Sequence, residues 1–138
     1  MRWLAGALLA LLLATLLPLG ANSKAGNAPA PVGDPKAGAD IYQRCLACHA
    51  LEYNRTGPRH CGLVGRRAGS VKDFQYSEAM RKSGLVWNRR TLDRFLSGPT
   101  KLVPGTLMTY AGVDDPKERA DLIAYLAQTT RDPKVCKP

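Results

Sequence analysis

Cys45-Leu46-Ala47-Cys48-His49 is the most informative stretch of this 138-residue sequence, and it reads C-x-x-C-H. Two cysteines three positions apart lie on the same side of a helix end, so both sulfurs can reach one flat partner. The adjacent histidine can then point its imidazole along the axis of that partner. This spacing is typical of c-type haem attachment, in which the vinyl groups bond to the sulfurs and the iron binds the histidine.

Three other interpretations of the cysteine pair are open. A thiol–disulfide redox pair normally accompanies a βαβ pattern, which is not seen here. A zinc site would need two further ligands, and His60 and Cys61 are the available ones. A structural disulfide is the third. The histidine directly after Cys48, in a helix-rich chain with export features, favours haem over all three.

Residues 1–21 have the features of a secretory signal peptide: a basic start, an apolar run from Trp3 to Leu19 and a small-residue exit. An uncleaved membrane anchor is the alternative, because this run is about the minimum length that spans a bilayer. Residues 22–33 indicate a flexible linker, 34–132 the folded domain and 133–138 a short tail. Cleavage and export predict a periplasmic protein, in which cysteines are paired or bonded.

The formal net charge is +9. A positive net charge of this size suits binding to an acidic protein partner or to a membrane surface, or it simply keeps the protein in solution. Nucleic acid is the other usual partner of a basic chain, and export argues against it.

Capping residues and apolar periodicity predict an all-α fold with long loops. The expected helices are residues 34–48, 77–82, 91–97 and 115–128, and residues 51–69 and 100–113 are expected to be loops. Asp34, Thr91 and Asp115 are the predicted N-caps of the first, third and fourth helices.

A second axial ligand would distinguish an electron carrier from a haem that binds gases. Met108 follows Pro104 and Gly105 in a predicted loop, which can bring a side chain over a flat cofactor. Met80 lies in a helical stretch, where filling the core is its expected role. From the residues alone, Met108 is the favoured ligand and an open iron is the alternative.

From residue 38 to residue 128 the chain resembles the class I cytochromes c, the mitochondrial-type family and its bacterial relatives. The matching segments, besides the haem motif, are Gly57-Pro58, residues 62–66, 74–77, Trp87, 104–108 and 119–126. The resemblance implies the cytochrome c fold, with three main helices and long loops around one covalent haem, and it implies Met108 as the sixth ligand.

The resemblance also implies further roles. The Pro58 carbonyl is expected to accept from the ring N–H of His49. Tyr76, Trp87 and Thr106 match positions that hydrogen-bond the haem propionates, and Arg66 matches one that balances their charge.

Other positions are expected to shape the domain around that site. A Cys61–Cys136 disulfide is expected near the end of the last helix. The crossing of the first and last helices is expected at Gly38, Tyr42, Leu122 and Tyr125. Phe95 and Met80 depart from the family by making the haem pocket more apolar. His60 is expected to be a surface residue.

The implied function is outer-sphere transfer of single electrons by a periplasmic, monomeric carrier that is not an enzyme. Its expected partners are redox complexes, such as a quinol–cytochrome c reductase and a terminal oxidase or dehydrogenase. It would meet a membrane only by docking or through an uncleaved N-terminus. The alternatives are a membrane-tethered oxidoreductase subunit, and a haem enzyme or gas sensor with a displaceable methionine.

Overall fold

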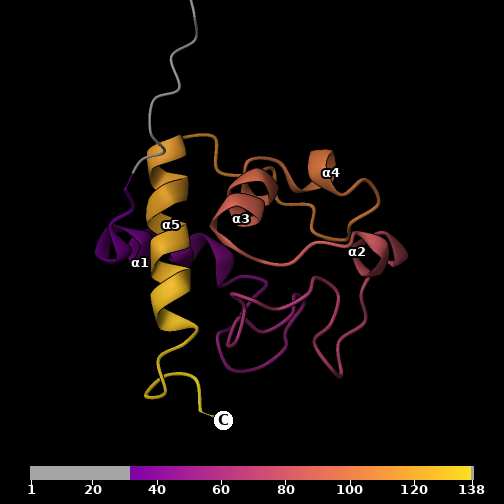
Figure 1. The fold of residues 1–138 in the computed structure, drawn as a ribbon, viewed down its shortest axis with the longest axis horizontal. Helices are drawn as coiled ribbons and strands as arrows, with labels where there is room; N and C mark the ends of the chain where they lie inside the picture. Colours follow the sequence, from indigo (N-terminus) through magenta and orange to yellow (C-terminus); the bar gives the residue numbers. More distant parts are fainter. Residues whose placement is uncertain (1–31, 138) are drawn as a thin grey trace, which may run out of the picture.

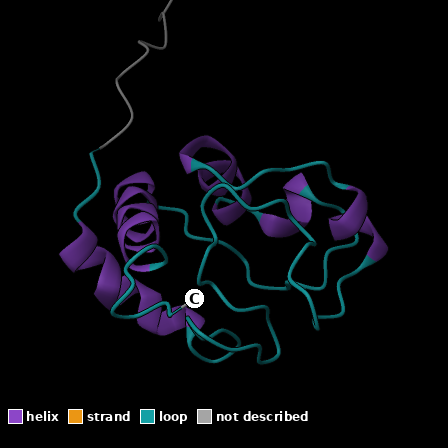
Figure 2. Cartoon of the chain, turned by 60° about the horizontal axis from the view of Figure 1, so that its bottom comes forward, coloured by secondary structure: helices purple, strands orange, loops and turns teal. Residues whose placement is uncertain are grey.

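Five helices and one 3-10 turn carry the fold in the computed structural model, which describes residues 32–137 (Figures 1 and 2). They are α1 (Pro35–Tyr42), η1 (Gln43–Cys45), α2 (Glu78–Lys82), α3 (Arg89–Leu96), α4 (Pro99–Leu102) and α5 (Pro116–Thr129). The described residues form no strand, only an isolated antiparallel bridge between Arg67 and Val86. The all-α prediction is therefore confirmed. The predicted signal peptide and residues 22–31 of the predicted linker lie outside the described residues.

The first and last helices cross each other, as Figure 1 shows for α1 and α5. Gly38 makes the close approach possible. A Cβ at this position would lie 2.6 Å from the backbone carbon of Asp121 and 2.7 Å from the Cβ of Tyr125. Beyond this point the rings of Tyr42 and Tyr125 pack with their centroids 5.1 Å apart. The predicted crossing residues therefore meet, and Leu122 is 1% exposed at the centre of the core.

Side-chain caps begin four of the helices. Asp34 and Asp115 cap α1 and α5 as predicted, and Pro35 and Pro116 take the first helical positions. The predicted cap Thr91 is wrong, because α3 begins two residues earlier. Asn88 is its N-cap and Thr91 completes a reciprocal capping box with it.

Two predicted boundaries also differ from the structure. The first helix was expected to continue to Cys48, yet its α-helical part ends at Tyr42 and a 3-10 turn follows. Residues 100–113 were expected to be loop throughout, yet Pro99 starts the short helix α4. Pro99 suits a first helical position because its missing N–H would be unpaired there anyway.

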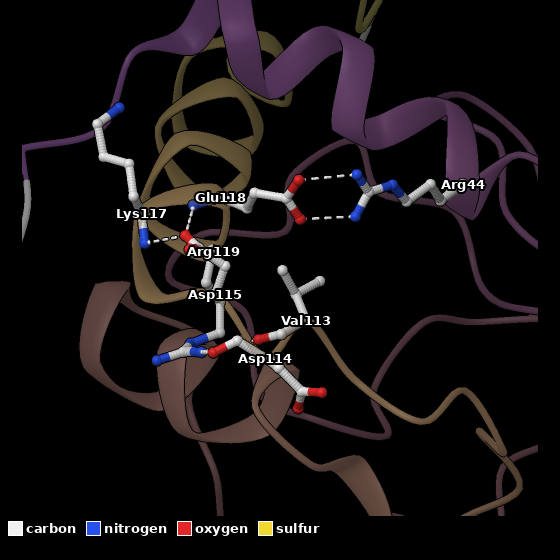
Figure 3. A network of polar contacts seen from close by, with 7 residues as sticks. All are labelled: Arg44, Val113, Asp114, Asp115, Lys117, Glu118 and Arg119. Atoms are coloured by element: carbon white, nitrogen blue, oxygen red, sulfur yellow. Dashed lines mark hydrogen bonds and ion pairs between the residues drawn. The ribbon is translucent and has the colours of Figure 1, made fainter.

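Arg119 ties α5 to the rest of the domain (Figure 3). Its Nε donates to a carboxylate oxygen of Asp93 on α3 at 2.7 Å, and its Nη1 donates to the carbonyl oxygens of Val113 and Asp114. This side chain therefore links two helices and the loop between them. None of the described helices is long and apolar enough to cross a membrane.

The expected disulfide is present between Cys61 and Cys136, 75 positions apart. It fastens the loop at residues 59–62 to the tail that follows α5, where the Gly62 N–H also donates to the Thr130 carbonyl at 2.9 Å. Among the described residues, Cys45 and Cys48 are the free cysteines. The two cysteine pairs therefore have separate roles.

Replacing both disulfide cysteines, Cys61→Ser with Cys136→Ser, is expected to lower the free energy of unfolding by about 3–4 kcal/mol. The reason is that the bond removes closure entropy of a long loop from the unfolded chain. Denaturant midpoints of the two proteins measure this difference. The reduced wild-type protein should match the double variant, since reductants do not break thioether bonds. Equal midpoints for the oxidised wild type and the variant would contradict the expectation.

Candidate functional site: a cavity between the helices and loops

All nine residues predicted to bind a cofactor line one cavity. They are Cys45, Cys48, His49, Pro58, Arg66, Tyr76, Trp87, Thr106 and Met108. Loops supply most of them, and helices α2, α3 and α5 supply apolar walls. Those wall residues are Met80, Leu92, Phe95, Leu96, Leu122 and Leu126. The fold thus gathers polar groups from separate loops around an apolar hollow, which is the usual composition of a cofactor site.

His49 is oriented by the loop that follows it. Its Nδ1 lies 2.8 Å from the carbonyl oxygen of Pro58, and a carbonyl can only accept, so Nδ1 carries the proton. Burial lowers the pKa of His49, which leaves Nε2 unprotonated and able to bind a metal. Gly57 allows this approach, since a Cβ there would lie 2.6 Å from both ring nitrogens.

His60 is not the surface residue that the sequence predicts. Its ring stacks on the ring of His49 with centroids 4.3 Å apart and an interplanar angle of 21°. Its Nδ1 lies 3.0 Å from the hydroxyl of Tyr42. Burial, with His49 and Arg66 nearby, lowers its pKa from 6.5 to about 3, so the ring is neutral at physiological pH. The sequence does not predict this contact, because the spacing of the two histidines matches no regular helical pattern that would bring their rings together.

Arg66 holds the segment that carries His60. Its guanidinium donates to the carbonyl oxygens of Cys61 and Arg59 at 2.8 and 2.9 Å. Burial lowers the pKa of Arg66. Tyr76 reaches the same cavity, and burial raises its pKa. A cation at this end of the cavity, beside a phenol, suits an anionic group on a cofactor.

Trp87 is 7% exposed and lines the cavity. An indole N–H that borders a cavity can donate to a polar group bound there. Thr106 is also buried, and its hydroxyl accepts from the Met108 N–H at 3.2 Å. This turn fixes the backbone next to Met108.

Two methionines reach the cavity, from different kinds of structure. Met108 comes from the loop at residues 103–113, whereas Met80 is on the short helix α2 and is 7% exposed. Phe95, 6% exposed, packs its ring 5.0 Å from that of Trp87. Met80 and Phe95 therefore make the wall apolar, as the sequence indicates.

Arg44, which also lines the cavity, is paired rather than free (Figure 3). Its guanidinium donates two hydrogen bonds to the carboxylate of Glu118, at 2.7 and 2.8 Å. Leu107, which lines the same cavity, presents an apolar side chain that is 74% exposed. The rim is thus less basic than the net charge of the chain suggests.

These features fit a covalently attached haem. The two thiols of the C-x-x-C-H motif are unpaired and line an apolar cavity, and an oriented histidine presents a free Nε2 to it. Trp87 offers an indole N–H to the cavity, and Arg66 offers a half-buried cation. A zinc site does not fit, because the described residues contain no cluster of three metal-ligating side chains.

Comparison with known proteins agrees with this interpretation. The family model described as Cytochrome c matches residues 35–130. The chain is 51% identical to the cytochrome c of Tetrahymena pyriformis, over 70% of this chain and 89% of that protein. It is 43% identical to the cytochrome c2 of Rhodomicrobium vannielii, over 69% and 78%. Cytochrome cH from Methylobacterium extorquens is 44% identical, with a TM-score of 0.67, over 69% of this chain and 98% of that one.

Proposed function

The chain belongs to the cytochrome c family, and we propose that it is a periplasmic single-electron carrier whose haem iron is bound by His49 and Met108. Membership of the family makes it a haem electron carrier and not an enzyme, with one c-type haem attached through Cys45 and Cys48 and with redox proteins as partners. The axial ligands, the compartment and the identity of the partners are the proposed parts.

One observation carries the ligand assignment: an oriented histidine and a loop methionine line the same apolar cavity as the two free thiols. When bound, the haem supplies an Fe(III)/Fe(II) couple. Around it, the Pro58 carbonyl fixes the tautomer of His49, and the Thr106 hydroxyl holds the backbone beside Met108. Apolar side chains line most of the cavity, and a site shielded from water lets the charge change with little rearrangement.

The remaining residues of the site would hold the edge of the haem. Arg66, Tyr76, Trp87 and Thr106 line the cavity with a cation, a phenol, an indole N–H and a hydroxyl. Such groups are the expected partners of the two propionates, because a buried carboxylate needs donors and a countercharge.

Residues 34–132 are proposed to form the carrier domain, behind a cleaved signal peptide at residues 1–21 and a linker at residues 22–33. The physiological partners proposed are a quinol–cytochrome c reductase on one side and a terminal oxidase or dehydrogenase on the other. With Arg44 paired to Glu118 and Leu107 exposed at the rim, docking should combine apolar contact with charge.

Replacement of the proposed sulfur ligand tests this function. The ferric wild-type protein should show the weak far-red sulfur-to-iron band, and its ferrous form should resist carbon monoxide. Met108→Ala is expected to abolish the band and to let carbon monoxide bind rapidly, because an axial position opens. Met80→Leu is the matched control and should behave as the wild type. Rapid binding of carbon monoxide by the wild type would favour a gas-binding haem protein instead.

A further inference from the structure

We propose that His60 is a positioning residue for His49: its ring, stacked on the ligand and locked by Tyr42, fixes the plane of the His49 imidazole and favours the ferric state of the bound haem. The inference rests on the proposed function, since it takes His49 as the iron ligand. His60 lies outside the C-x-x-C-H motif, and nothing in that motif requires a histidine at this position.

The contact is unusual for a side chain that merely fills a core. The ring of His60 is nearly parallel to that of His49, at 21° and a centroid separation of 4.3 Å. Placing a polar ring in such a site has a desolvation cost that an aliphatic side chain would avoid. That cost is offset here by the hydroxyl of Tyr42, 3.0 Å from His60 Nδ1. A polar ring with a dedicated partner therefore indicates a role beyond packing.

The two contacts on His49 restrain different motions. The hydrogen bond to Pro58 fixes the direction of the Nδ1–H bond, yet it leaves the ring able to rock about that direction. A flat ring lying against its face opposes this rocking, because any tilt would bring ring atoms into collision. Together the two contacts define one plane for the ligand.

His60 itself is held from several sides. The backbone N–H of His60 is shared between the carbonyl oxygens of Ala50 and Leu51, 3.1 Å from each. Arg66 donates to the backbone carbonyls of Arg59 and Cys61, which flank His60. Cys61 is also in the disulfide. Tyr42, its side-chain partner, is 2% exposed. The ring therefore has little freedom to leave the stack.

The expected effect on the redox equilibrium follows from the charge on the ligand. His49 carries more positive charge when the iron that it binds is ferric than when it is ferrous. The π face of a neutral aromatic ring is negative, so a stacked ring stabilises the more positive state. Loss of the ring is expected to lower the ferric-to-ferrous ratio at a fixed applied potential about two- to fivefold. At 59 mV per tenfold, this corresponds to a reduction potential higher by roughly 20–40 mV.

Four holoprotein variants test this inference by redox titration and by the haem-methyl proton shifts of the ferric form, which depend on the plane of the axial ligand. His60→Leu should shift the ratio and change the methyl pattern. His60→Phe keeps an aromatic face, so its ratio should stay within about twofold of the wild type. Tyr42→Phe should change the methyl pattern, because the His60 ring loses its hydrogen bond to the Tyr42 hydroxyl. Val64→Ala, which shortens a partly buried apolar side chain in the segment after His60 without lining the cavity, should change neither property.

The inference is overturned if His60→Leu leaves both the ratio and the methyl pattern unchanged, or if Val64→Ala alters them equally. Should His60→Leu fail to mature, the other variants decide. Tyr42→Phe with a wild-type methyl pattern, or His60→Phe with a ratio shifted more than about twofold, contradicts the role. A wild-type protein without the far-red band would instead refute the proposed ligands, so the two failures are distinguishable.

Discussion

Replacing both motif cysteines, Cys45→Ala with Cys48→Ala, is expected to leave a chain with no covalently held haem and little stable structure. Residues from four helices and several loops face the cavity that the haem would fill. Without a ligand, their apolar side chains would face water, and a domain stabilised by only about 5–15 kcal/mol has little reserve for that loss. We therefore expect the far-UV circular dichroism of the double variant to lose most of its helical signal.

Haem staining of a denaturing gel measures the covalent bond directly. The double variant should give no stained band, whereas the disulfide variant Cys61→Ser with Cys136→Ser should stain as the wild type does. These two pairs are a matched comparison, since each removes two sulfurs from the same domain. Haem that stays with the Cys45→Ala, Cys48→Ala chain under denaturing conditions would contradict the attachment.

The second large effect is expected at the crossing of α1 and α5. Gly38→Val would place a branched side chain where even a Cβ lies 2.6 Å from the Asp121 backbone carbon. Backbone cannot move aside as a flexible side chain can, so the two helices must separate. We expect a loss of at least about 3 kcal/mol in the free energy of unfolding, at the upper end of the usual cost of overpacking.

Asp40→Val is the control for this substitution. Asp40 is exposed on the same helix, so the change introduces the same β-branched residue without a clash, and its expected cost is under about 1 kcal/mol. Chemical denaturation of the two holoproteins gives the comparison. Similar midpoints for Gly38→Val and Asp40→Val would show that the helices do not meet as described.

Local sequence signals predicted the elements that depend on neighbouring residues. The C-x-x-C-H motif, the Asp-Pro helix starts and the Pro-Gly loop before Met108 each act within a few positions, and the structure has the helix starts where they were expected. The error at α3 has the same origin. Asn88 and Thr91 are both good capping residues, and only the backbone of the actual first turn distinguishes them.

Contacts between distant segments left no such signal. The Asp34 N–H donates to the carboxylate of Asp121 at 2.6 Å, across 87 positions, and Lys117 adds an ion pair to the same carboxylate. These partners, through their hydrogen bonds, hold the pKa of Asp121 below its usual value. A buried aspartate on the apolar side of α5 is not evident from the sequence, since its partners are known only once α1 is in place.

The site itself was predictable because family resemblance supplied the distant pairings. His60 is the exception. It differs from the other site residues in acting through His49 rather than on the ligand, and no spacing rule connects it to Tyr42, 18 positions away. The pairing of Arg44 with Glu118 is a similar case, at a separation of 74. In both pairs, a polar or charged group near the cavity has a partner that the amino-acid composition does not reveal.

The proton NMR spectrum of the ferrous holoprotein shows whether Met108 binds the haem iron. A methionine methyl bound to iron lies over the porphyrin ring, whose ring current moves its resonance far upfield. We predict one such methyl signal, which persists in Met80→Leu and disappears in Met108→Ala. A spectrum without an upfield methyl, or one whose upfield methyl is lost in Met80→Leu instead, would contradict the assignment of His49 and Met108 as the ligands of an electron-carrying haem.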